Sequence, residues 1–347
     1  MRLSDFDYEL PPELIAQEAT ADRAASRLMV CDRAAGAPVH ATFRDLPQYL
    51  REGDVLVVNK SRVVPARLLL TRSTGGKVEA LFLDPIDDRD FIAWVKPLGR
   101  LHPGETLKAE DGTTAFRFVE RTGEREAILR LDASPHATVE AALDAIGHVP
   151  LPPYITRADR PDDRARYQTV FAQAPGSVAA PTAGLHFDPP LLQTLQSRGV
   201  EVLSLVLHVG VGTFQPLEEE EIEKNRLHAE RFQIDARTIE RLQTARREKR
   251  RIIAVGTTVT RTLETLAARG CLDADPQDHD AQTDLFITPG YPFQVVGALL
   301  TNFHLPQSSL LLLVCAFAGR ERILAWYREA VEQRYRFYSY GDAMLIG

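Results

Sequence analysis

Apolar and polar residues alternate in strand-like and helix-like patterns through the second half of the chain. The segments 200–210 (VEVLSLVLHVG) and 251–256 (RIIAVG) are typical of buried strands, whereas 188–199 and 236–249 carry apolar residues at helical spacing. We expect Asp188 to cap the first helix and Gly199 to lie beyond its end. Strands that alternate with helices predict an α/β fold in which helices cover a sheet.

Between about residues 63 and 131 the pattern changes to short β-rich runs separated by the turns TGG, HPG, EDG and TGE. Strands at such regular spacing predict a small antiparallel barrel or sandwich. The proline-rich segment 150–153 then forms a stiff connector back to the alternating pattern. We therefore predict an inserted β-barrel domain at 62–149 within a discontinuous α/β domain formed by 1–61 and 150–347.

Composition narrows the class of protein. The 347 residues exceed what one hydrophobic core usually supports, which agrees with two domains. Three scattered cysteines without CxxC spacing argue against a disulfide framework and a cysteine zinc site, and the charged, proline-containing start does not resemble a secretion signal. The longest apolar run, 310–318, has nine residues, fewer than the roughly 20 that span a bilayer. We expect a cytoplasmic protein without membrane insertion.

Three histidines lie within or after apolar segments next to glycine-containing turns: His186 in PTAGLHF, His208 in VLHVGVGTF and His304 in LLTNFHLP. Ligands of open α/β sheets bind beyond the carboxyl ends of the strands, where such turns gather. We expect these imidazoles to converge on one ligand crevice, with a satisfied core or turn position as the alternative for each. Metal ligation is a weaker alternative without an HExxH motif, and no GxSxG nucleophile elbow is present.

Further candidates have structural alternatives. The segment 251–270 runs from a strand through Gly256, Thr257 and Thr258 into a helix, so its first turn could offer free N–H groups to an anionic or polar ligand; a Thr-capped turn without ligand is the alternative. It lacks the dinucleotide and P-loop motifs. Asp342 follows the aromatic segment YRFYSYG. The segment RREKRR has five basic residues of six, suited to phosphates or to a solvated helix end, in a chain of net charge −7.

Taken in order, the segments PTAGLHF, LHVGVGTFQP, AVGTTVTRTLE, LLTNFHLPQSSLLLLV and YRFYSYGDAMLI closely resemble the S-adenosylmethionine:tRNA ribosyltransferase-isomerases of queuosine biosynthesis. ELIAQ, SRLMV, GDVLVVN, RVVPARL and PLPPYI extend this resemblance over nearly the whole chain. The family is similarly described as an α/β domain with an inserted β-barrel. The resemblance implies that S-adenosylmethionine binding and catalysis belong to the α/β domain.

The resemblance implies transfer and isomerisation of the ribosyl moiety of S-adenosylmethionine. The acceptor is 7-aminomethyl-7-deazaguanine at the wobble position of a tRNA with a GUN anticodon, and the products are epoxyqueuosine-tRNA, adenine and methionine. S-adenosylmethionine is then a consumed co-substrate, with no cofactor or metal expected, and the protein is expected to be a monomer. Two alternatives remain: a non-catalytic relative that binds tRNA, and a metal-dependent hydrolase built on clustered histidines.

This chemistry needs a base for an acidified ribose 5′ proton and an acid for the departing adenine. We expect His186, His208 or His304 to supply one role and Asp342 or Glu230 the other. The expected substrate-binding residues are Thr182, Gly184, Gly210, Gly212, Thr213, Gly256, Thr257, Thr258, Arg261 and Asn302. The expected tRNA-binding residues are Arg246, Arg247, Lys249, Arg250 and Arg251.

The chain departs from the family pattern at several positions. An Asp-Thr pair is expected within the segment 59–62, which reads Asn-Lys-Ser-Arg, and a His-x-Met-His-x-Glu where residues 225–230 read Asn-Arg-Leu-His-Ala-Glu. Gly297 stands in place of an Asp, and a Pro and an Asp expected near Ala19 and Ala24 are missing. The chain is therefore interpreted as a divergent member.

Overall fold

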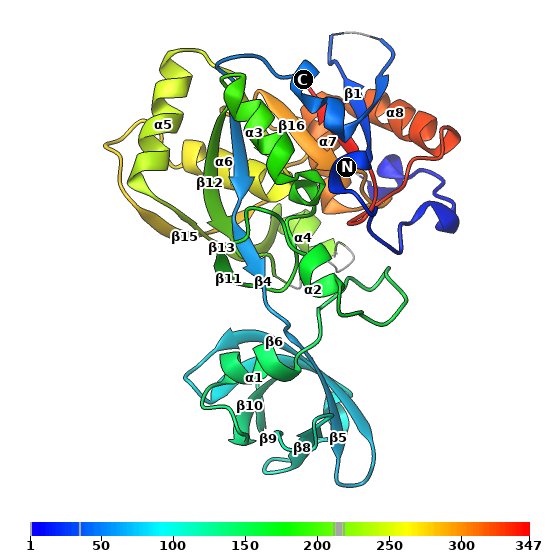
Figure 1. Ribbon diagram of the computed structural model, residues 1–347, viewed down its shortest axis with the longest axis vertical. Helices are drawn as coiled ribbons and strands as arrows, with labels where there is room; N and C mark the ends of the chain where they lie inside the picture. Colours follow the sequence, from blue (N-terminus) through cyan, green and yellow to red (C-terminus); the bar gives the residue numbers. More distant parts are fainter. Residues whose placement is uncertain (1, 35, 211, 213–216, 218) are drawn as a thin grey trace.

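The computed structural model describes residues 2–34, 36–210, 212, 217 and 219–347, and within these ranges it contains a nine-stranded mixed sheet and a closed six-stranded barrel. The barrel lies beyond one end of the sheet domain and is joined to it by a narrow waist (Figure 1). This arrangement confirms the predicted fold class of a helix-covered sheet with an inserted antiparallel β-barrel.

The large sheet is parallel at its centre. Strand β3 pairs in parallel with β12 on one side and β14 on the other, and β14 pairs in parallel with β16. The sheet order is β15 (His279–Leu285), β13 (Arg226–Ile234), β12 (Glu201–Leu207), β3 (Val55–Asn59), β14 (Ile252–Val255), β16 (Ala298–Asn302), β17 (Ala343–Ile346), β1 (Arg27–Cys31) and β2 (Val39–Thr42). The carboxyl ends of the four central strands therefore meet at one edge.

Helices cover both faces of this sheet. The side chains of β3 alternate, so that Val55 and Val57 join the core under α6 while Leu56 and Val58 join the core under α3. The helices are α3 (Pro189–Ser197), α4 (Glu219–Lys224), α5 (Ala236–Arg247), α6 (Thr257–Ala268), α7 (Ser309–Ala318) and α8 (Arg320–Glu332). Five 3-10 segments accompany them: η1 (Leu3–Phe6), η2 (Pro12–Leu14), η3 (Arg23–Ala25), η4 (Phe43–Gln48) and η6 (Thr182–His186). Asp188 accepts a hydrogen bond from Leu191 and caps α3 as predicted.

The barrel is antiparallel throughout. Its strands are, in barrel order, β10 (Glu126–Ala133), β7 (Asp90–Lys96), β6 (Lys77–Pro85), β5 (Arg67–Arg72), β8 (Thr106–Ala109) and β9 (Ala115–Arg121). Alternate residues such as Phe91 and Phe116 fill its interior, and Val139 and Leu143 of α1 (Val139–Ile146) belong to the same core. A further 3-10 turn, η5 (Leu98–Arg100), follows β7. Because each barrel strand has one buried face, apolar and polar residues alternate along it, and this alternation in the sequence predicts the barrel.

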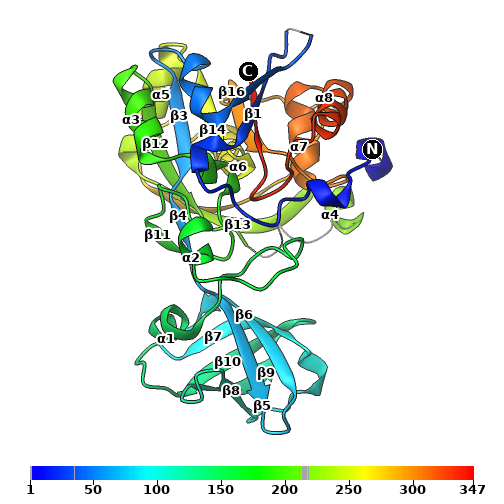
Figure 2. The ribbon, with the colours of Figure 1, turned by 45° about the vertical axis from the view of Figure 1, so that its right-hand side comes forward.

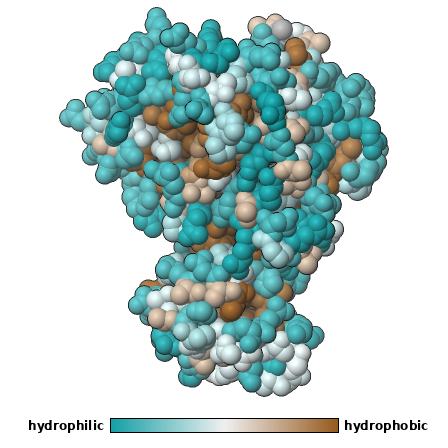
Figure 3. Space-filling view, in the orientation of Figure 1, coloured by the Kyte–Doolittle hydropathy of each residue, from teal (hydrophilic) through white to brown (hydrophobic). Residues whose placement is uncertain are grey.

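Two chain segments form the waist between the barrel and the sheet. Strand β4 (Ser61–Val63) leads into the barrel and pairs in parallel with β11 (Ala174–Ser177), which follows the return segment. That return segment carries α2 (Asp163–Arg166) between the two domains (Figure 2). Hydrophobic residues reach the surface mainly over the middle of the sheet domain and near the waist (Figure 3).

No helix among the described residues is long and apolar enough to cross a membrane. The longest apolar run of the sequence falls in α7, whose residues are mostly buried. Cys31, Cys271 and Cys315 are all free, and burial raises the pKa of the Cys315 thiol to about 12. The buried cysteines therefore act as small apolar core residues.

Candidate active site

A cavity of about 540 Å³ lies at the carboxyl ends of β12, β14 and β16. Its volume is typical of a small-molecule site, and it occupies the place where open α/β sheets bind ligands. Segments far apart in the sequence line it: 179–183, 256–258, 301–310 and 338–339, with Leu3, Pro153, Tyr154, Val209 and Leu217. The motifs PTAGLHF, AVGTT and LLTNFHLP therefore meet in one place.

The amino end of α6 opens onto this cavity. Gly256 is the N-cap, has a φ of 94° and provides no side-chain cap, and Thr257 and Thr258 line the cavity beside it. A residue with a side chain would be strained at this φ. Because the cap brings no side-chain oxygen to the first turn, the N–H groups of that turn are suited to a polar or anionic ligand. This geometry favours the ligand-binding interpretation over a Thr-capped turn.

Asn302 ends β16 and also lines the cavity. Its Nδ2 atom donates to the carbonyl oxygens of Tyr338 (3.1 Å) and Asp342 (3.4 Å) and to Nε2 of His186 (3.1 Å). Since two of these partners are carbonyl oxygens that only accept, the orientation of the amide is fixed. Asn302 therefore anchors the C-terminal loop to the cavity wall.

His186 lies behind that wall, outside the residues that line the cavity. Its Nδ1 is 2.7 Å from Oγ of Ser26, its ring stacks on Phe43, and its Nε2 accepts from Asn302. Burial and the nearby guanidinium groups of Arg336 and Arg23 lower the pKa of His186 to about 3. The ring is neutral, carries its proton on Nδ1, and serves to position Asn302.

His304 is the histidine that reaches the cavity. Its Nε2 lies 2.8 Å from Oγ1 of Thr301, and its backbone N–H donates to the hydroxyl of Tyr327. Burial lowers the pKa of His304 to about 3. The imidazole is therefore neutral at physiological pH and has one unprotonated ring nitrogen, and the lowered pKa makes it a weak base.

His208 stands apart from the other two. It follows β12, and a Cβ built on Gly176 would come within 3.1 Å of its ring. Burial and Arg231 lower its pKa, and its buried Nδ1 has no hydrogen-bond partner within the part of the chain that the structure describes. The predicted convergence of three histidines is therefore reduced to His304 at the cavity and His186 behind it.

Glu230 and Arg261, expected near the substrate, form a buried ion pair with each other. Glu230 also accepts from the backbone N–H of Gly210 (3.2 Å), and Arg261 donates to the carbonyl oxygen of Leu285 (2.9 Å). Neither residue is among those that line the cavity. The pair ties β13 to α6 and holds the turn after β12.

The carboxylate of Asp342 is likewise engaged in hydrogen bonds, in this case with backbone N–H groups. It accepts from the N–H groups of Arg27 and Arg336, both at 2.8 Å. Burial raises its pKa, against the effect of these hydrogen bonds. Asp342 lies outside the cavity lining and closes the loop that carries Tyr338 and Ser339 into the cavity.

The predicted substrate-binding glycines and threonines divide into two groups. Thr182, Gly256, Thr257, Thr258 and Asn302 line the cavity, whereas Gly184, Gly210 and Gly212 do not. A Cβ at Gly184 would meet Thr169 at 2.9 Å, and one at Gly212 would meet His228 at 2.6 Å, so both glycines allow close packing. Thr213 lies outside the described residues.

Sequence reasoning did not single out Tyr154 and Ser339 as site residues. The ring centroids of Tyr154 and Tyr338 are 4.2 Å apart, and the hydroxyl of Tyr154 is 2.5 Å from Oγ of Ser339. All three line the cavity and give it an aromatic wall suited to a planar base. The signal available in the sequence was Tyr154 directly after the proline-rich connector.

The basic segment 246–251 lies at the amino end of β14, opposite the end that faces the cavity. Three of its arginines form ion pairs: Arg246–Asp273 (2.9 Å), Arg250–Glu201 (2.7 Å) and Arg251–Asp54 (2.5 Å). Arg247 and Lys249 are exposed and have no ion pair among the described side chains. Binding of tRNA by this segment stays a prediction, and its placement does not favour it.

None of the positions that depart from the family pattern is among the described residues that line the cavity. Asn59 is buried and bonds both backbone groups of Leu207, which joins β3 to β12. Gly297 precedes β16, and its carbonyl oxygen accepts from Arg33. Ala24 is buried under η4. These substitutions change the scaffold rather than the described cavity lining.

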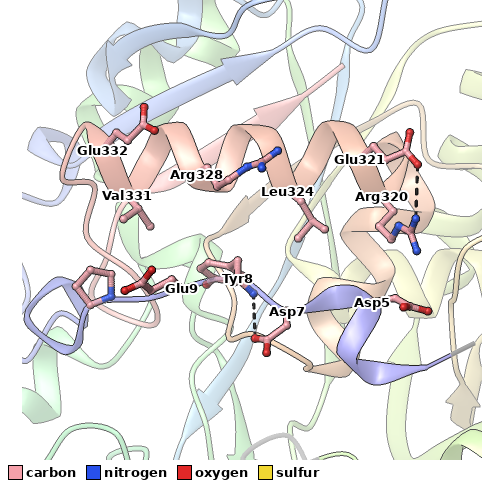
Figure 4. Close-up of a pocket in the computed structure, with 11 residues that line it drawn as sticks. Asp5, Asp7, Tyr8, Glu9, Arg320, Glu321, Leu324, Arg328, Val331 and Glu332 are labelled. Carbon is pink, nitrogen blue, oxygen red and sulfur yellow. Dashed lines mark hydrogen bonds and ion pairs between the residues drawn. The ribbon is translucent and has the colours of Figure 1, made fainter.

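A second hollow, of about 690 Å³, lies between the N-terminal segment and α8 (Figure 4). Charged side chains such as Asp7, Glu9 and Arg328 line much of it, and Tyr8 in its lining donates to the carbonyl oxygen of His304 in the wall of the first cavity. Among the described residues, no group of three His, Cys, Asp or Glu side chains could hold a metal ion. The clustered histidines required by the hydrolase alternative are therefore not formed.

Comparison with known proteins agrees with this architecture. The family model described as "Queuosine biosynthesis protein" matches residues 3–346. The S-adenosylmethionine:tRNA ribosyltransferase-isomerases of Solibacter usitatus and Heliobacterium modesticaldum are 50% and 49% identical to the chain, with full coverage of both chains in each case. The crystal structure of an S-adenosylmethionine tRNA ribosyltransferase from Thermotoga maritima is 36% identical, covers 99% of this chain and 100% of its own, and superposes with a TM-score of 0.57. The chain belongs to the queuosine biosynthesis family of S-adenosylmethionine:tRNA ribosyltransferase-isomerases.

Proposed function

We propose that the protein transfers the ribosyl moiety of S-adenosylmethionine to 7-aminomethyl-7-deazaguanine at the wobble position of tRNA with a GUN anticodon. The ribosyl unit isomerises to the epoxycyclopentanediol of epoxyqueuosine, and adenine and methionine leave. The observation that carries this proposal is the single cavity that the family motifs line together at the strand ends. S-adenosylmethionine is consumed as a co-substrate, and the reaction needs no further cofactor.

The lining of the cavity suits a nucleoside and a polar tail. Tyr154 and Tyr338 offer ring faces to a base, while the uncapped first turn of α6 offers N–H groups to hydroxyl or carboxylate oxygens. The wobble base must enter the same cavity, and an anticodon loop can present an unstacked base without opening a duplex.

His304 is the proposed proton-transfer residue. A sulfonium acidifies the neighbouring ribose 5′ hydrogens, and the unprotonated nitrogen of an imidazole that lines the cavity is the proposed acceptor for one of them. Asn302 is the proposed positioning residue for the sugar or base, held by His186. Glu230 and Asp342 are left to structural roles because their oxygens are already engaged.

The test is adenine release from S-adenosylmethionine by the purified protein, followed by chromatography. We expect adenine to appear only with tRNA that carries 7-aminomethyl-7-deazaguanine, and the same tRNA with guanine at the wobble position is the control. Binding of the modified tRNA without adenine release would instead identify a non-catalytic tRNA-binding relative.

A further inference from the structure

Three arginines from separate parts of the chain meet at the outer side of the cavity wall. Arg23 of η3 and Arg166 of α2 line a small hollow together with Ser339, and Arg336 lies beside it. Arg336 and Arg23 both act on the imidazole of His186, which lines the same hollow. The cluster Arg23, Arg166 and Arg336 is called the arginine cluster below.

The arginine cluster is held by carbonyl oxygens and not by carboxylates. Arg23 donates to the carbonyl oxygens of Leu185 (3.1 Å) and Ala165 (2.8 Å), Arg166 donates to that of Thr20, and Arg336 donates to that of Glu18. None of the three forms an ion pair with the side chains that the structure describes. Each guanidinium has five N–H donors, so most of them remain for a ligand.

Two carboxylates that act on the arginine cluster are committed elsewhere. Asp188 caps α3, and Asp342 accepts from two backbone N–H groups, although both act on the cluster at longer range. Burial, followed by the repulsion of Arg166, lowers the pKa of Arg23. Like charges are thus held together without a direct ion pair among the described side chains, and a bound anion would relieve their repulsion.

The cluster also lies in the right place relative to the cavity. Ser339 lines both the hollow of the arginine cluster and the main cavity. An anion bound to the cluster would therefore lie next to a base in the cavity. In contrast, three of the five cations in the segment 246–251 are already paired with carboxylates, at the other end of β14.

We propose that Arg23, Arg166 and Arg336 bind a backbone phosphate of tRNA that flanks the nucleotide whose base enters the cavity. This proposal rests on the proposed function for the identity of the nucleic acid. Planar guanidinium groups match phosphate oxygens in bidentate geometry, which suits them to this task better than lysines. The cluster would then fix the wobble nucleotide relative to the donor.

The test compares R166Q/R336Q with the charge-matched control R198Q/R269Q, which removes two exposed cations at the carboxyl ends of α3 and α6. The dissociation constant of tRNA is measured against salt concentration without S-adenosylmethionine. The association constant falls as salt is added. Loss of one phosphate contact in a single-stranded region makes the plot of its logarithm against log salt concentration less steep by about 0.7. We expect this decrease, and binding on the order of tenfold weaker at low salt, for R166Q/R336Q alone.

Further measurements separate a phosphate site from other roles. The variant R166K/R336K keeps both charges and is expected to keep the slope; a loss equal to that of the glutamine pair would overturn the proposal. An unchanged slope in R166Q/R336Q would also overturn it. Weaker binding of S-adenosylmethionine with unchanged tRNA binding would assign the cluster to the donor carboxylate. If the glutamine pair lowers the thermal midpoint sharply, R166Q and its control R198Q replace the two double variants.

The binding experiment does not depend on turnover. Wild-type protein that binds tRNA through the cluster but releases no adenine would overturn the proposed function and leave the phosphate site standing. Wild-type protein that releases adenine, with a salt slope independent of the cluster, would overturn the phosphate site alone.

Discussion

Burial decides the charge of the two histidines nearest the reaction. His186 and His304 both lose access to water and have pKa values lowered to about 3, so both are neutral in the folded protein. The two rings differ in their partners. Both ring nitrogens of His186 are hydrogen-bonded, one to Ser26 and one to Asn302, whereas His304 lines the cavity. A neutral imidazole at that wall has one unprotonated nitrogen that can accept a proton, while its other nitrogen keeps a single N–H that donates a hydrogen bond.

Replacing His304 tests this assignment. We expect H304Q to lower kcat for adenine release by about 10²- to 10⁴-fold, the usual contribution of a general acid or base. The matched variant H208Q removes a histidine outside the cavity lining and should change kcat only a few fold. Equal losses in the two variants would remove His304 from the proton transfer.

The same pKa shifts predict how stability depends on pH. A histidine whose pKa is lowered by folding binds its proton only in the unfolded chain between about pH 3 and 6.5, so the free energy of unfolding falls as pH decreases through this window. When the pH falls from 6 to 5, the free energy of unfolding should therefore decrease by about 1 kcal/mol less in H186Q than in wild type, as measured by urea unfolding. The control is H102Q, at an exposed histidine; wild-type-like pH dependence in H186Q would refute the shift.

At the scale of the elements, one buried ion pair connects a strand to the helix that opens onto the cavity. Glu230 of β13 and Arg261 of α6 satisfy each other, and removing one partner leaves a buried charge. E230Q should therefore lower the free energy of unfolding by about 3 to 5 kcal/mol. The double variant E230L/R261M should recover a large part of this loss. If its loss in free energy of unfolding equals the sum of the losses of E230L and R261M, the pairing is contradicted.

The elements themselves could largely be predicted from their hydrophobic patterns. α3, α5 and α6 each bury one stripe, and the barrel strands each bury one face, so local periodicity identifies them. Their arrangement could not be predicted in the same way. β3 lies between β12 and β14 although Val55 is 146 positions from Glu201 and 197 positions from Ile252, and such long-range pairing leaves no local signal.

In the candidate site, too, local sequence patterns identify individual residues but not their long-range partners. Short motifs indicate that Asn302, His304, Thr257 and Thr258 lie near a ligand because they follow strands that end at one edge. They do not reveal which polar groups the scaffold occupies, as it does for Glu230, Asp342 and His186. Those roles depend on partners far away in the sequence, such as Asn302 for His186.

At the scale of the whole molecule, charge distribution matters more than charge balance. A chain of net charge −7 can still bind RNA where its arginines lack carboxylate partners. The arginine cluster at the cavity fits this requirement, whereas the most basic segment of the sequence is largely neutralised. The waist carries α2, and with it Arg166 of the arginine cluster, between the sheet domain and the barrel (Figure 2).

The central claim is that S-adenosylmethionine donates its ribosyl group and not its methyl group. The most direct measurement supplies modified tRNA with S-adenosylmethionine labelled either in the ribose or in the methyl carbon, and determines the nucleoside mass and the free adenine. We expect the ribose label to enter the tRNA in a one-to-one ratio with adenine, while the methyl label leaves in methionine. Methyl label in the tRNA, or ribose label without adenine release, would contradict it.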